Sequence, residues 1–282
     1  MNEELIVVGK NSYIGRYFTK FAIENGHQVI ALSSKDCDFL DKDAVIDFFR
    51  SLGQASYSVV FFAAVNKSKA NDFQAFLDNI HIVQNLINGL KFATITSLIY
   101  FSSVDMYGAS PVLPITEQSR INPDTWYGLA KCNCEWMLTA SKEVDCPVTV
   151  MRIPGVYGPG SNDRSVIGQL VRGILEEKKV IIHGTGNVLR DYVYVEDICR
   201  LLWKIIPLRH EGVLNIATGH SHAIVDITQS IGQTAQAEYD LTLEPTDPTR
   251  EFDLTFDIDA LRKLLPDFQF SELSAGIRSY LL

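Results

Sequence analysis

The first half of the chain alternates between short apolar runs and longer amphipathic segments, and this alternation limits the folds it can adopt. Five apolar runs have the length of a buried strand: Leu5–Val8, Val29–Leu32, Val59–Phe62, Leu98–Phe101 and Val148–Met151. Four segments between them carry apolar residues at helical spacing: Ile14–Glu24, Ala44–Leu52, Phe73–Leu90 and Tyr127–Ala140. Continuously apolar strands that alternate with helices form parallel sheets covered on both faces. We therefore predict an α/β fold with a Rossmann-type, doubly wound parallel sheet.

The second half has a different character. It begins with the Gly- and Pro-rich loop "IPGVYGPGSND" at residues 153–163, which leaves the sheet. The helices expected after this loop are Ser165–Glu177, Glu196–Ile206 and Ile224–Ala235, and the strands are Val180–His183 and Val213–Ala217. An acidic, Pro-containing tail follows them. These pieces predict a small α/β cap. We assign residues 1–154 to the sheet domain, with residues 192–210 returning to it, and residues 155–191 and 211–282 to the cap.

Charge and composition restrict the partners of the chain. The formal net charge is −9 over 282 residues, and no block of Lys and Arg is present to neutralise the phosphates of a nucleic acid. The longest apolar run, around Val59–Val65, is too short to cross a bilayer. The acidic start Met1–Glu4 does not resemble a signal peptide. The five cysteines are therefore expected to be reduced thiols of a cytoplasmic protein.

The turn after the first expected strand suits a phosphate group. In "IVVGKNSYIG", Gly9, Ser12 and Gly15 have the spacing G-x-x-S-x-x-G. Glycines allow a tight turn and a close approach of the backbone to a pyrophosphate, and the N-terminus of the next helix favours the anion. Ser12 replaces the middle glycine of the usual motif with another small residue. We interpret the turn as a dinucleotide site, with an ordinary strand–helix turn as the alternative.

The end of the second expected strand bears on the choice of dinucleotide. An acidic residue there would bind the ribose hydroxyls of NAD and repel the 2′-phosphate of NADP. The segment "ALSSKD" instead offers Ser33, Ser34 and Lys35, two hydroxyls and a cation that suit a phosphate. The sequence therefore favours NADP over NAD, although a solvated loop has a similar composition.

Ser103, Tyr127 and Lys131, which lie in later segments of the chain, could carry acid–base chemistry. Ser103 follows the fourth expected strand, and Tyr127 and Lys131 lie one turn apart on the next expected helix. A tyrosine titrates at about pH 10, and a neighbouring ammonium would lower the pKa of its phenol. Ser103 could then hydrogen-bond a substrate oxygen while Tyr127 transfers a proton. The order of Gly-rich turn, strand-end serine and Tyr/Lys pair predicts an active site.

These motifs resemble those of the extended short-chain dehydrogenase/reductase family, which includes nucleotide-sugar epimerases, dehydratases and ketoreductases. The resemblance covers nearly the whole chain. It rests on the Gly9–Gly15 turn and on Ser103 with Tyr127 and Lys131. It also rests on further segments: "FFAAV" (61–65), Asn79, "VYGPG" (156–160), "RDYVYVED" (190–197), "LNIATG" (214–219) and "PTREFD" (248–253).

The resemblance implies a role for each matched position. The sheet domain would bind the dinucleotide, and the cap would bind a nucleotide-sugar substrate. Ser103, Tyr127 and Lys131 would form the catalytic triad. NAD(P) would contact Tyr127, Lys131 and a further set: Gly9, Ser12, Tyr13, Ile14, Gly15, Ser33, Ser34, Lys35, Asp38, Phe62, Ala63 and Ala64. The substrate would contact Asn79, Asp105, Arg190 and Arg250. Relatives often form homodimers through the helix that carries the tyrosine, and this chain could do so.

Departures from the family pattern narrow the expected activity. The 4,6-dehydratases of the family have an Asp-Glu pair directly after the catalytic hydroxyl, whereas this chain has Val104 and Asp105. The missing acid argues against dehydratase activity. Asp105 stands where some relatives carry a group used in epimerisation, although a solvated or capping aspartate is the simpler interpretation. Gly155 stands where many relatives have an asparagine that touches the substrate diphosphate.

Several hypotheses remain open from the sequence. The first is reduction of a 4-keto sugar nucleotide, and an epimerase that uses tightly bound NAD would need the same residues. A catalytically silent dinucleotide-binding regulator and a reductase of a non-sugar carbonyl are the others. A metal site is not expected, because Cys132 and Cys134 would point to different faces of a helix and because His220 and His222 lack a third ligand nearby.

Overall fold

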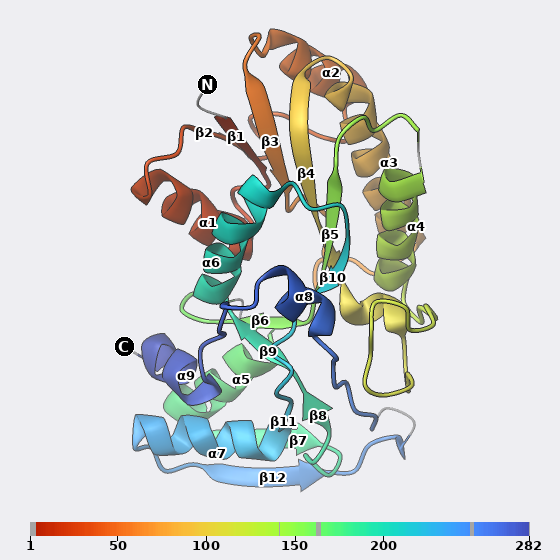
Figure 1. The fold of residues 1–282 in the computed structure, drawn as a ribbon. Helices are drawn as coiled ribbons and strands as arrows, with labels where there is room; N and C mark the ends of the chain where they lie inside the picture. Colours follow the sequence, from red (N-terminus) through yellow and green to blue (C-terminus); the bar gives the residue numbers. More distant parts are fainter. Residues whose placement is uncertain (1–3, 141, 162–164, 249–250, 282) are drawn as a thin grey trace. The chain divides into compact units, whose positions relative to one another are not determined.

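The structure is a computed structural model that describes residues 4–140, 142–161, 165–248 and 251–281. Its central feature is a parallel sheet. Among these residues the sheet has six strands in the order β10–β5–β4–β3–β1–β2 (Figure 1). The strands are β1 (Glu4–Val8), β2 (Val29–Leu32), β3 (Ser56–Phe61), β4 (Thr94–Ser103), β5 (Val148–Ile153) and β10 (Gly212–Asn215). The predicted α/β class is therefore confirmed.

The order of the strands creates a switch point beside β1. The chain passes outward from β1 to β2 and then returns across β1 to form β3. Val8 at the end of β1 is in register with Leu32 of β2 and with Phe61 of β3. The loops after these three strands therefore begin at the same level, and the carboxyl edge of such a sheet is where ligands bind.

Helices cover both faces of the sheet (Figure 1). The helices are α1 (Tyr13–Glu24), α2 (Lys42–Ser51), α3 (Phe73–Leu90), α4 (Trp126–Ala140) and α6 (Val195–Ile205). The pair α1 and α6 lies on one face, where Phe21 and Trp203 meet edge to face at 5.7 Å, and α2, α3 and α4 lie on the other. Ser12, Asp41 and Asp72 cap α1, α2 and α3, because their side chains accept backbone N–H groups of the first turn. None of the described helices is both long and apolar enough to span a membrane.

The chain divides into two compact units. The first comprises residues 1–108, 121–152 and 198–214, and the second comprises residues 109–120, 153–197 and 215–282. The second unit contains short strands: β6 (Gly155–Tyr157), β7 (Lys179–His183), β8 (Leu189–Arg190), β9 (Tyr192–Tyr194), β11 (His222–Ala223) and β12 (Asp240–Glu244). They pair as β6 with β9, β7 with β12, and β8 with β11. Its helices include α5 (Val166–Arg172), α7 (Ile224–Ala235), α8 (Asp259–Leu264) and α9 (Leu273–Leu281).

The second unit differs from the predicted elements in several places, since the short strands β6, β8, β9 and β11 were not predicted. The single helix expected over Ser165–Glu177 ends at Arg172 and continues as a π-helical turn over Gly173–Glu177. The tail, for which no element was predicted, contains β12, α8 and α9. The residues of β12 are mostly exposed, and this strand is held by its parallel ladder with β7, about sixty residues earlier. Local apolar spacing therefore could not reveal it.

Two buried carboxylates hold loops of the second unit together. Asp191 accepts hydrogen bonds from the backbone N–H groups of Thr218 and Gly219, each at 3.0 Å. Asp197 accepts the backbone N–H of Ser271 at 2.7 Å and its hydroxyl at 2.8 Å. Burial raises the pKa of Asp191, and the bonds from Thr218 and Gly219 act in the opposite direction. Each buried carboxylate is thus itself satisfied by donors from a distant loop, as a buried charge requires.

Gly89 of α3 offers a test of the packing between α3 and α2. A Cβ at this position would overlap the buried ring of Phe49 and would lie 2.9 Å from Cγ1 of Val45. We expect Gly89→Ala to lower the free energy of unfolding, because overpacking costs about 1–3 kcal/mol and helix propensity returns only about 1 kcal/mol. Urea unfolding measures the change. Gly53→Ala is the control, since a Cβ there meets nothing within 4 Å, and equal stabilities of the two variants would contradict the described packing.

Candidate active site

The turn after β1 forms a cradle that side chains would fill. Gly9 has a φ of +91°, and a Cβ on it would lie 2.9 Å from the backbone nitrogen of Ala63. A Cβ on Gly15 would overlap the carbonyl oxygen of Gly9. The hydroxyl of Ser12 accepts the N–H of Gly15 at 3.1 Å, and α1 begins with Tyr13 and Ile14. Bare backbone and a helix N-terminus therefore meet at the switch point, and these residues fit the pyrophosphate of a dinucleotide.

The loop after β2 carries an acid that the sequence prediction overlooked. Asp36 Oδ2 accepts the backbone N–H of Ser33 at 2.8 Å and its hydroxyl at 2.6 Å. Nζ of Lys10 lies 2.8 Å from the same oxygen. The hydrogen bonds from Lys10 and Ser33 hold the pKa of Asp36 well below its usual range. Ser33 is thus committed to Asp36, and the residues that remain exposed for a 2′-phosphate are Ser34 and Lys35.

The loop after β3 lies against the Gly-rich turn. Phe62 donates its backbone N–H to the carbonyl oxygen of Val8 at 2.9 Å. The ring of Phe62 packs on Phe101 with a centroid separation of 4.3 Å. Ala63 and Ala64 follow and are half-buried, whereas Asp38, the acid expected near the adenine, lies exposed in the loop after β2. The segment Phe62–Ala64 and the Gly-rich turn are therefore brought together, as a shared cofactor site requires.

Asn79 of α3 positions this loop. Its Oδ1 accepts the backbone N–H of Val65 at 2.9 Å, and its Nδ2 donates to the carbonyl oxygen of Val65 at 3.0 Å. The side chain is 4% exposed and also donates to the carbonyl oxygen of Ala75. Because the amide is used in this way, the structure gives Asn79 a task other than the substrate contact that the family resemblance implies.

Ser103 and Asp105 stand where β4 ends. Ser103 is the last residue of β4, and its hydroxyl accepts the backbone N–H of Asp105 at 3.2 Å. This bond caps the 3₁₀ turn η1 (Val104–Tyr107). The carboxylate of Asp105 forms an ion pair with Lys67, whose Nζ lies 2.6 Å away. The sequence reasoning had given Asp105 no such partner, because Lys67 belongs to a different loop.

Tyr127 lies in the first turn of α4, and its surroundings make it a weak acid. Its backbone N–H donates to Oδ1 of Asn71 at 3.0 Å. A Cβ on the next residue, Gly128, would lie 2.7 Å from the carbonyl oxygen of Asp105, so α4 approaches η1 closely. Burial and the negative charge of Asp105 raise the pKa of Tyr127 well above its usual range. In the ligand-free chain this direction is opposite to the lowering that was expected from Lys131 together with a positively charged nicotinamide.

Lys131 is buried one helical turn after Tyr127. Its Nζ donates to the carbonyl oxygen of Phe101 at 2.6 Å and to the hydroxyl of Tyr100 at 3.2 Å. The same atom lies 5.7 Å from the ring centroid of Tyr127. Burial lowers the pKa of Lys131 to about 8. Lys131 therefore remains mainly cationic at neutral pH, and β4 fixes the position of its ammonium beside Tyr127.

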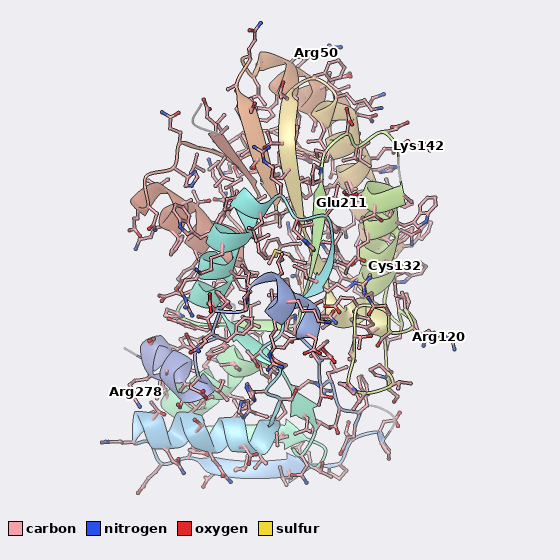
Figure 2. All side chains as sticks on the ribbon, in the orientation of Figure 1. Arg50, Arg120, Cys132, Lys142, Glu211 and Arg278 are labelled. Atoms are coloured by element: carbon pink, nitrogen blue, oxygen red, sulfur yellow. The ribbon has the colours of Figure 1, made fainter. Side chains whose placement is uncertain are left out.

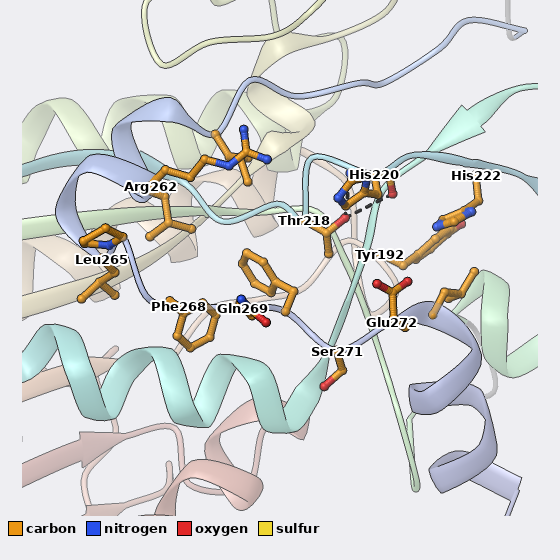
Figure 3. Close-up of a pocket in the computed structure, with 15 residues that line it drawn as sticks. Tyr192, Thr218, His220, His222, Arg262, Leu265, Phe268, Gln269, Ser271 and Glu272 are labelled. Carbon is orange, nitrogen blue, oxygen red and sulfur yellow. Dashed lines mark hydrogen bonds between the residues drawn. The ribbon is translucent and has the colours of Figure 1, made fainter.

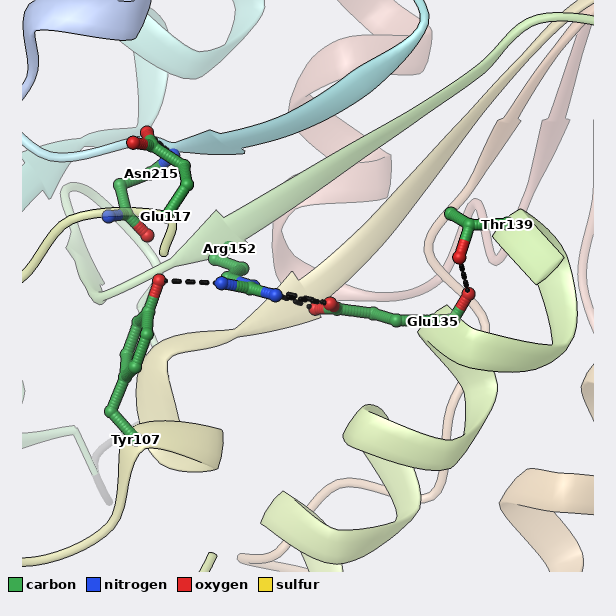
Figure 4. Close-up of polar contacts among 6 residues, drawn as sticks. All are labelled: Tyr107, Glu117, Glu135, Thr139, Arg152 and Asn215. Carbon is green, nitrogen blue, oxygen red and sulfur yellow. Dashed lines mark hydrogen bonds and ion pairs between the residues drawn. The ribbon is translucent and has the colours of Figure 1, made fainter. Parts of the chain in front are cut away.

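A buried ion pair that was not anticipated anchors the middle of α4 (Figure 4). Nη2 of Arg152 on β5 lies 2.8 Å from Oε2 of Glu135 on α4. Nη1 of Arg152 donates to the hydroxyl of Tyr107 at 2.8 Å. Burial lowers the pKa of Arg152, but the hydrogen bonds to Glu135 more than offset this effect, so the pKa is raised overall. The network ties α4, β5 and η1 together.

The second unit contains Arg190, which the sequence assigned to the substrate. Nη1 of Arg190 donates to the carbonyl oxygens of Leu189 and Phe252, and its guanidinium lies over the ring of Phe252 at 5.2 Å. Burial lowers the pKa of Arg190. Its contact with a diphosphate stays a prediction. Arg250 lies outside the described residues.

A structural reason for glycine at position 155 is also visible in the second unit. A Cβ on Gly155 would overlap the ring of Tyr192, so this ring occupies the space that a larger side chain would need. Tyr192 also lines a cavity of about 480 Å³ within the second unit, together with His220, His222 and Arg262 (Figure 3). His220 and His222, which were considered as metal ligands from the sequence, thus line one cavity.

The cysteines are free thiols. Cys134 is buried and donates to the carbonyl oxygen of Asn79 at 3.5 Å, whereas Cys132 on α4 is partly exposed (Figure 2). Burial raises the pKa of Cys134 to about 11. Among the residues that the structure describes, no three or more His, Cys, Asp or Glu side chains group as metal ligands would.

The Glu135–Arg152 pair can be tested by removing one or both charges. We expect Arg152→Met to lower the free energy of unfolding by about 3–5 kcal/mol, because it leaves the carboxylate of Glu135 buried and unpaired. The double variant Arg152→Met, Glu135→Leu should recover much of this loss, since no buried charge remains. Chemical denaturation of the wild type and both variants measures the effect. A double variant no more stable than Arg152→Met would contradict the assignment of the cost to the unpaired charge.

Comparison with known proteins shows the family of the chain. The family described as "NAD dependent epimerase/dehydratase family" matches residues 5–217. A UDP-glucose 4-epimerase of Lactobacillus helveticus is 25% identical over 281 residues, which is 86% of this chain and 84% of the relative.

Solved structures share the fold over nearly the whole chain. The structure of RMD from Pseudomonas aeruginosa complexed with NADPH has a TM-score of 0.83 and 21% identity, covering 99% of this chain and 98% of that one. The UDP-N-acetylglucosamine 4-epimerase of Methanobrevibacter ruminantium M1, in complex with UDP-N-acetylmuramic acid, has a TM-score of 0.84 and 22% identity, covering 99% and 97%. The chain therefore belongs to the NAD dependent epimerase/dehydratase family, within the extended short-chain dehydrogenases/reductases.

Proposed function

We propose that the chain reduces a 4-keto group of a nucleotide sugar with NAD(P)H. The observation that carries this proposal is the placement of Ser103, Tyr127 and Lys131 at the carboxyl edge of the sheet that also bears the Gly9–Gly15 cradle. In this proposal the first unit binds the dinucleotide and the second unit, with Arg190 and Arg250, binds the substrate. The relatives whose names include UDP-sugars support the class of substrate.

Each of the three residues Ser103, Tyr127 and Lys131 would have its own role in the reduction. The bound nicotinamide supplies the hydride. Tyr127, whose pKa is raised by burial and by Asp105, is protonated at neutral pH and donates its proton to the carbonyl oxygen. Ser103 donates a hydrogen bond to the same oxygen. The ammonium of Lys131, held by Phe101 and Tyr100, stabilises the phenolate that Tyr127 leaves behind.

Epimerisation is the second candidate, because several relatives are named as 4-epimerases and the same residues could oxidise and then reduce one carbon. The two activities differ in their cofactor balance. A reductase consumes one NAD(P)H per product, whereas an epimerase regenerates a tightly held cofactor. A silent regulator would bind the dinucleotide without turnover, and the presence of Ser103, Tyr127 and Lys131 argues against it.

A panel of nucleotide sugars and their 4-keto derivatives tests the proposal. We expect stoichiometric loss of NAD(P)H with one keto-sugar nucleotide. Tyr127→Phe should lower kcat by at least about 100-fold, because general acid catalysis contributes on that order, and should leave the Kd of the cofactor nearly unchanged. Activity without net NAD(P)H consumption would favour the epimerase. Cofactor binding without turnover of any member of the panel would favour the regulator.

NADP is the proposed cofactor. Ser34 and Lys35 are exposed after β2, and Asp36 beside them is neutralised by Lys10. We expect Lys35→Ala to weaken NADPH binding about twofold to fivefold, the effect of one exposed ion pair, and to leave NADH binding unchanged. Fluorescence titration measures both dissociation constants, with Lys20→Ala on α1 as the matched control. Equal losses for the two cofactors, or tighter binding of NADH by the wild type, would contradict the preference.

A homodimer through α3 and α4 is proposed as well. Three aromatic side chains are exposed on these helices: Phe73 by 57%, Trp126 by 41% and Trp136 by 70%. Exposed aromatic residues of this size are enriched in protein interfaces. They support a contact between copies of the chain that involves the helix of Tyr127.

A further inference from the structure

The second unit contains a cavity to which the proposed reaction gives no role. Its volume is about 480 Å³, within the usual range of sites for small ligands, about 300–1,000 Å³. It lies where the start of β9, the loop after β10, α8 and the segment between α8 and α9 meet (Figure 3). Among the described residues that line it, none was assigned to the triad, the dinucleotide or the substrate.

Two buried carboxylates hold walls of this cavity in place. Thr218 and Ser271 both line the cavity. Asp191, which is 2% exposed, accepts the hydroxyl of Thr218 as well as its backbone N–H, each at 3.0 Å. Asp197, which is 1% exposed, accepts the hydroxyl and the backbone N–H of Ser271. Neither segment can fold into the cavity without leaving a buried charge unpaired. The space is therefore preformed, and a ligand can enter it with little reorganisation of the chain.

Aromatic and aliphatic side chains form part of the wall. Phe268 and Phe270 meet edge to face, with ring centroids 5.1 Å apart. Leu261 of α8 and Leu265 also line the cavity. Aromatic side chains pair well with a further ring in offset or edge-to-face contact. The apolar part of the cavity therefore suits an aromatic ring.

Arg262 of α8 brings a positive charge to the cavity. Its Nη1 lies 3.8 Å from Oδ1 of Asp259, and the two side chains are 59% and 64% exposed. An exposed pair of this kind contributes little stability, so a ligand can replace it. Nη2 lies beside the loop after β10, because a Cβ on Gly219 would be 3.7 Å from it. A guanidinium offers two parallel donors to a carboxylate.

Glu272, the residue before α9, brings a negative charge to the same cavity. Figure 3 shows its carboxylate apart from the guanidinium of Arg262. This carboxylate repels a second anionic group of a ligand and can accept a hydrogen bond from a hydroxyl or amino group. The other ionisable side chains of the described lining are Tyr192, His220 and His222. Burial raises the pKa of Tyr192 to about 12, so its hydroxyl is a hydrogen-bond donor at neutral pH.

We propose that this cavity is a second ligand site and that it takes a small aromatic carboxylate carrying a hydroxyl or amino group. The carboxylate of the ligand binds Arg262, its ring packs on Phe268 and Phe270, and its donor group faces Glu272. Glu272 disfavours a ligand with several negative charges, so the ligand differs in class from the diphosphate of a nucleotide sugar. The inference goes beyond the proposed reductase activity and does not depend on it.

Isothermal titration with 4-hydroxybenzoate tests the site in the full chain, without cofactor or substrate. We expect one saturable site per chain, and Arg262→Met should weaken binding at least about tenfold, since a charged hydrogen bond is lost. Arg278→Met is the matched control, because this exposed arginine of α9 does not line the cavity (Figure 2). It should change the Kd by less than about twofold, and thermal unfolding checks that both variants are folded. Absence of saturable binding, or equal losses in the two variants, would overturn the site.

Two related probes test the class of the ligand. The neutral 4-hydroxybenzamide should bind at least about tenfold more weakly than the acid, because it lacks the charge that Arg262 pairs with. Terephthalate, which has a second carboxylate in place of the hydroxyl, should also bind the wild type more weakly than 4-hydroxybenzoate. Glu272→Gln removes the repulsion, so it should tighten the binding of terephthalate and weaken that of 4-hydroxybenzoate. Equal affinities for the acid and the amide, or a preference between the two acids that Glu272→Gln leaves unchanged, would contradict the proposed chemistry.

Discussion

The register of three parallel strand ends is the constraint on which the rest of the candidate site depends. Because Val8 pairs with both Leu32 and Phe61, the loops after β1, β2 and β3 start at one level. The backbone of Ala63 then comes so close to Gly9 that no side chain fits between them. This close approach leaves the N-terminus of α1 open to a phosphate. Ser103 ends β4, the strand next to β3 in the same sheet, so the turn proposed to bind the cofactor and the serine proposed to hydrogen-bond the substrate share one edge.

Two buried cations position α4 relative to that edge. Lys131 is satisfied by groups of β4, and Arg152 of β5 is satisfied by Glu135 and Tyr107. A buried cation is stable only with such partners, and a displaced helix would leave the charges unpaired. Tyr127 therefore has little freedom. Burial and the charge of Asp105 raise its pKa, and Nζ of Lys131 lies 5.7 Å from its ring centroid.

Local patterns in the sequence predicted the strands and helices of the first half because each of these elements shows its burial in its own residues. Contacts between distant segments were beyond such patterns. Asp36 was missed because its partner Lys10 belongs to the turn after β1, and Arg152 was missed because Glu135 lies on another element. Asn79 was singled out from the sequence, but the hydrogen bonds of its side-chain amide to the backbone of Val65 were not predicted. The lowered pKa of Tyr127 was predicted from the positive charges of Lys131 and of a bound nicotinamide, without the burial and the Asp105 charge that raise the pKa in the ligand-free chain.

We propose that Tyr127 and its neighbours support hydride transfer between a nicotinamide and a sugar carbon. The most direct measurement is mass spectrometry of the product formed from a 4-keto sugar nucleotide and NADPH that carries deuterium at the transferred position of the ring. We predict one deuterium atom on carbon 4 of the sugar in the wild type and none with Tyr127→Phe. Product that contains hydrogen only from the solvent, or unchanged substrate beside tightly bound cofactor, would contradict the claim.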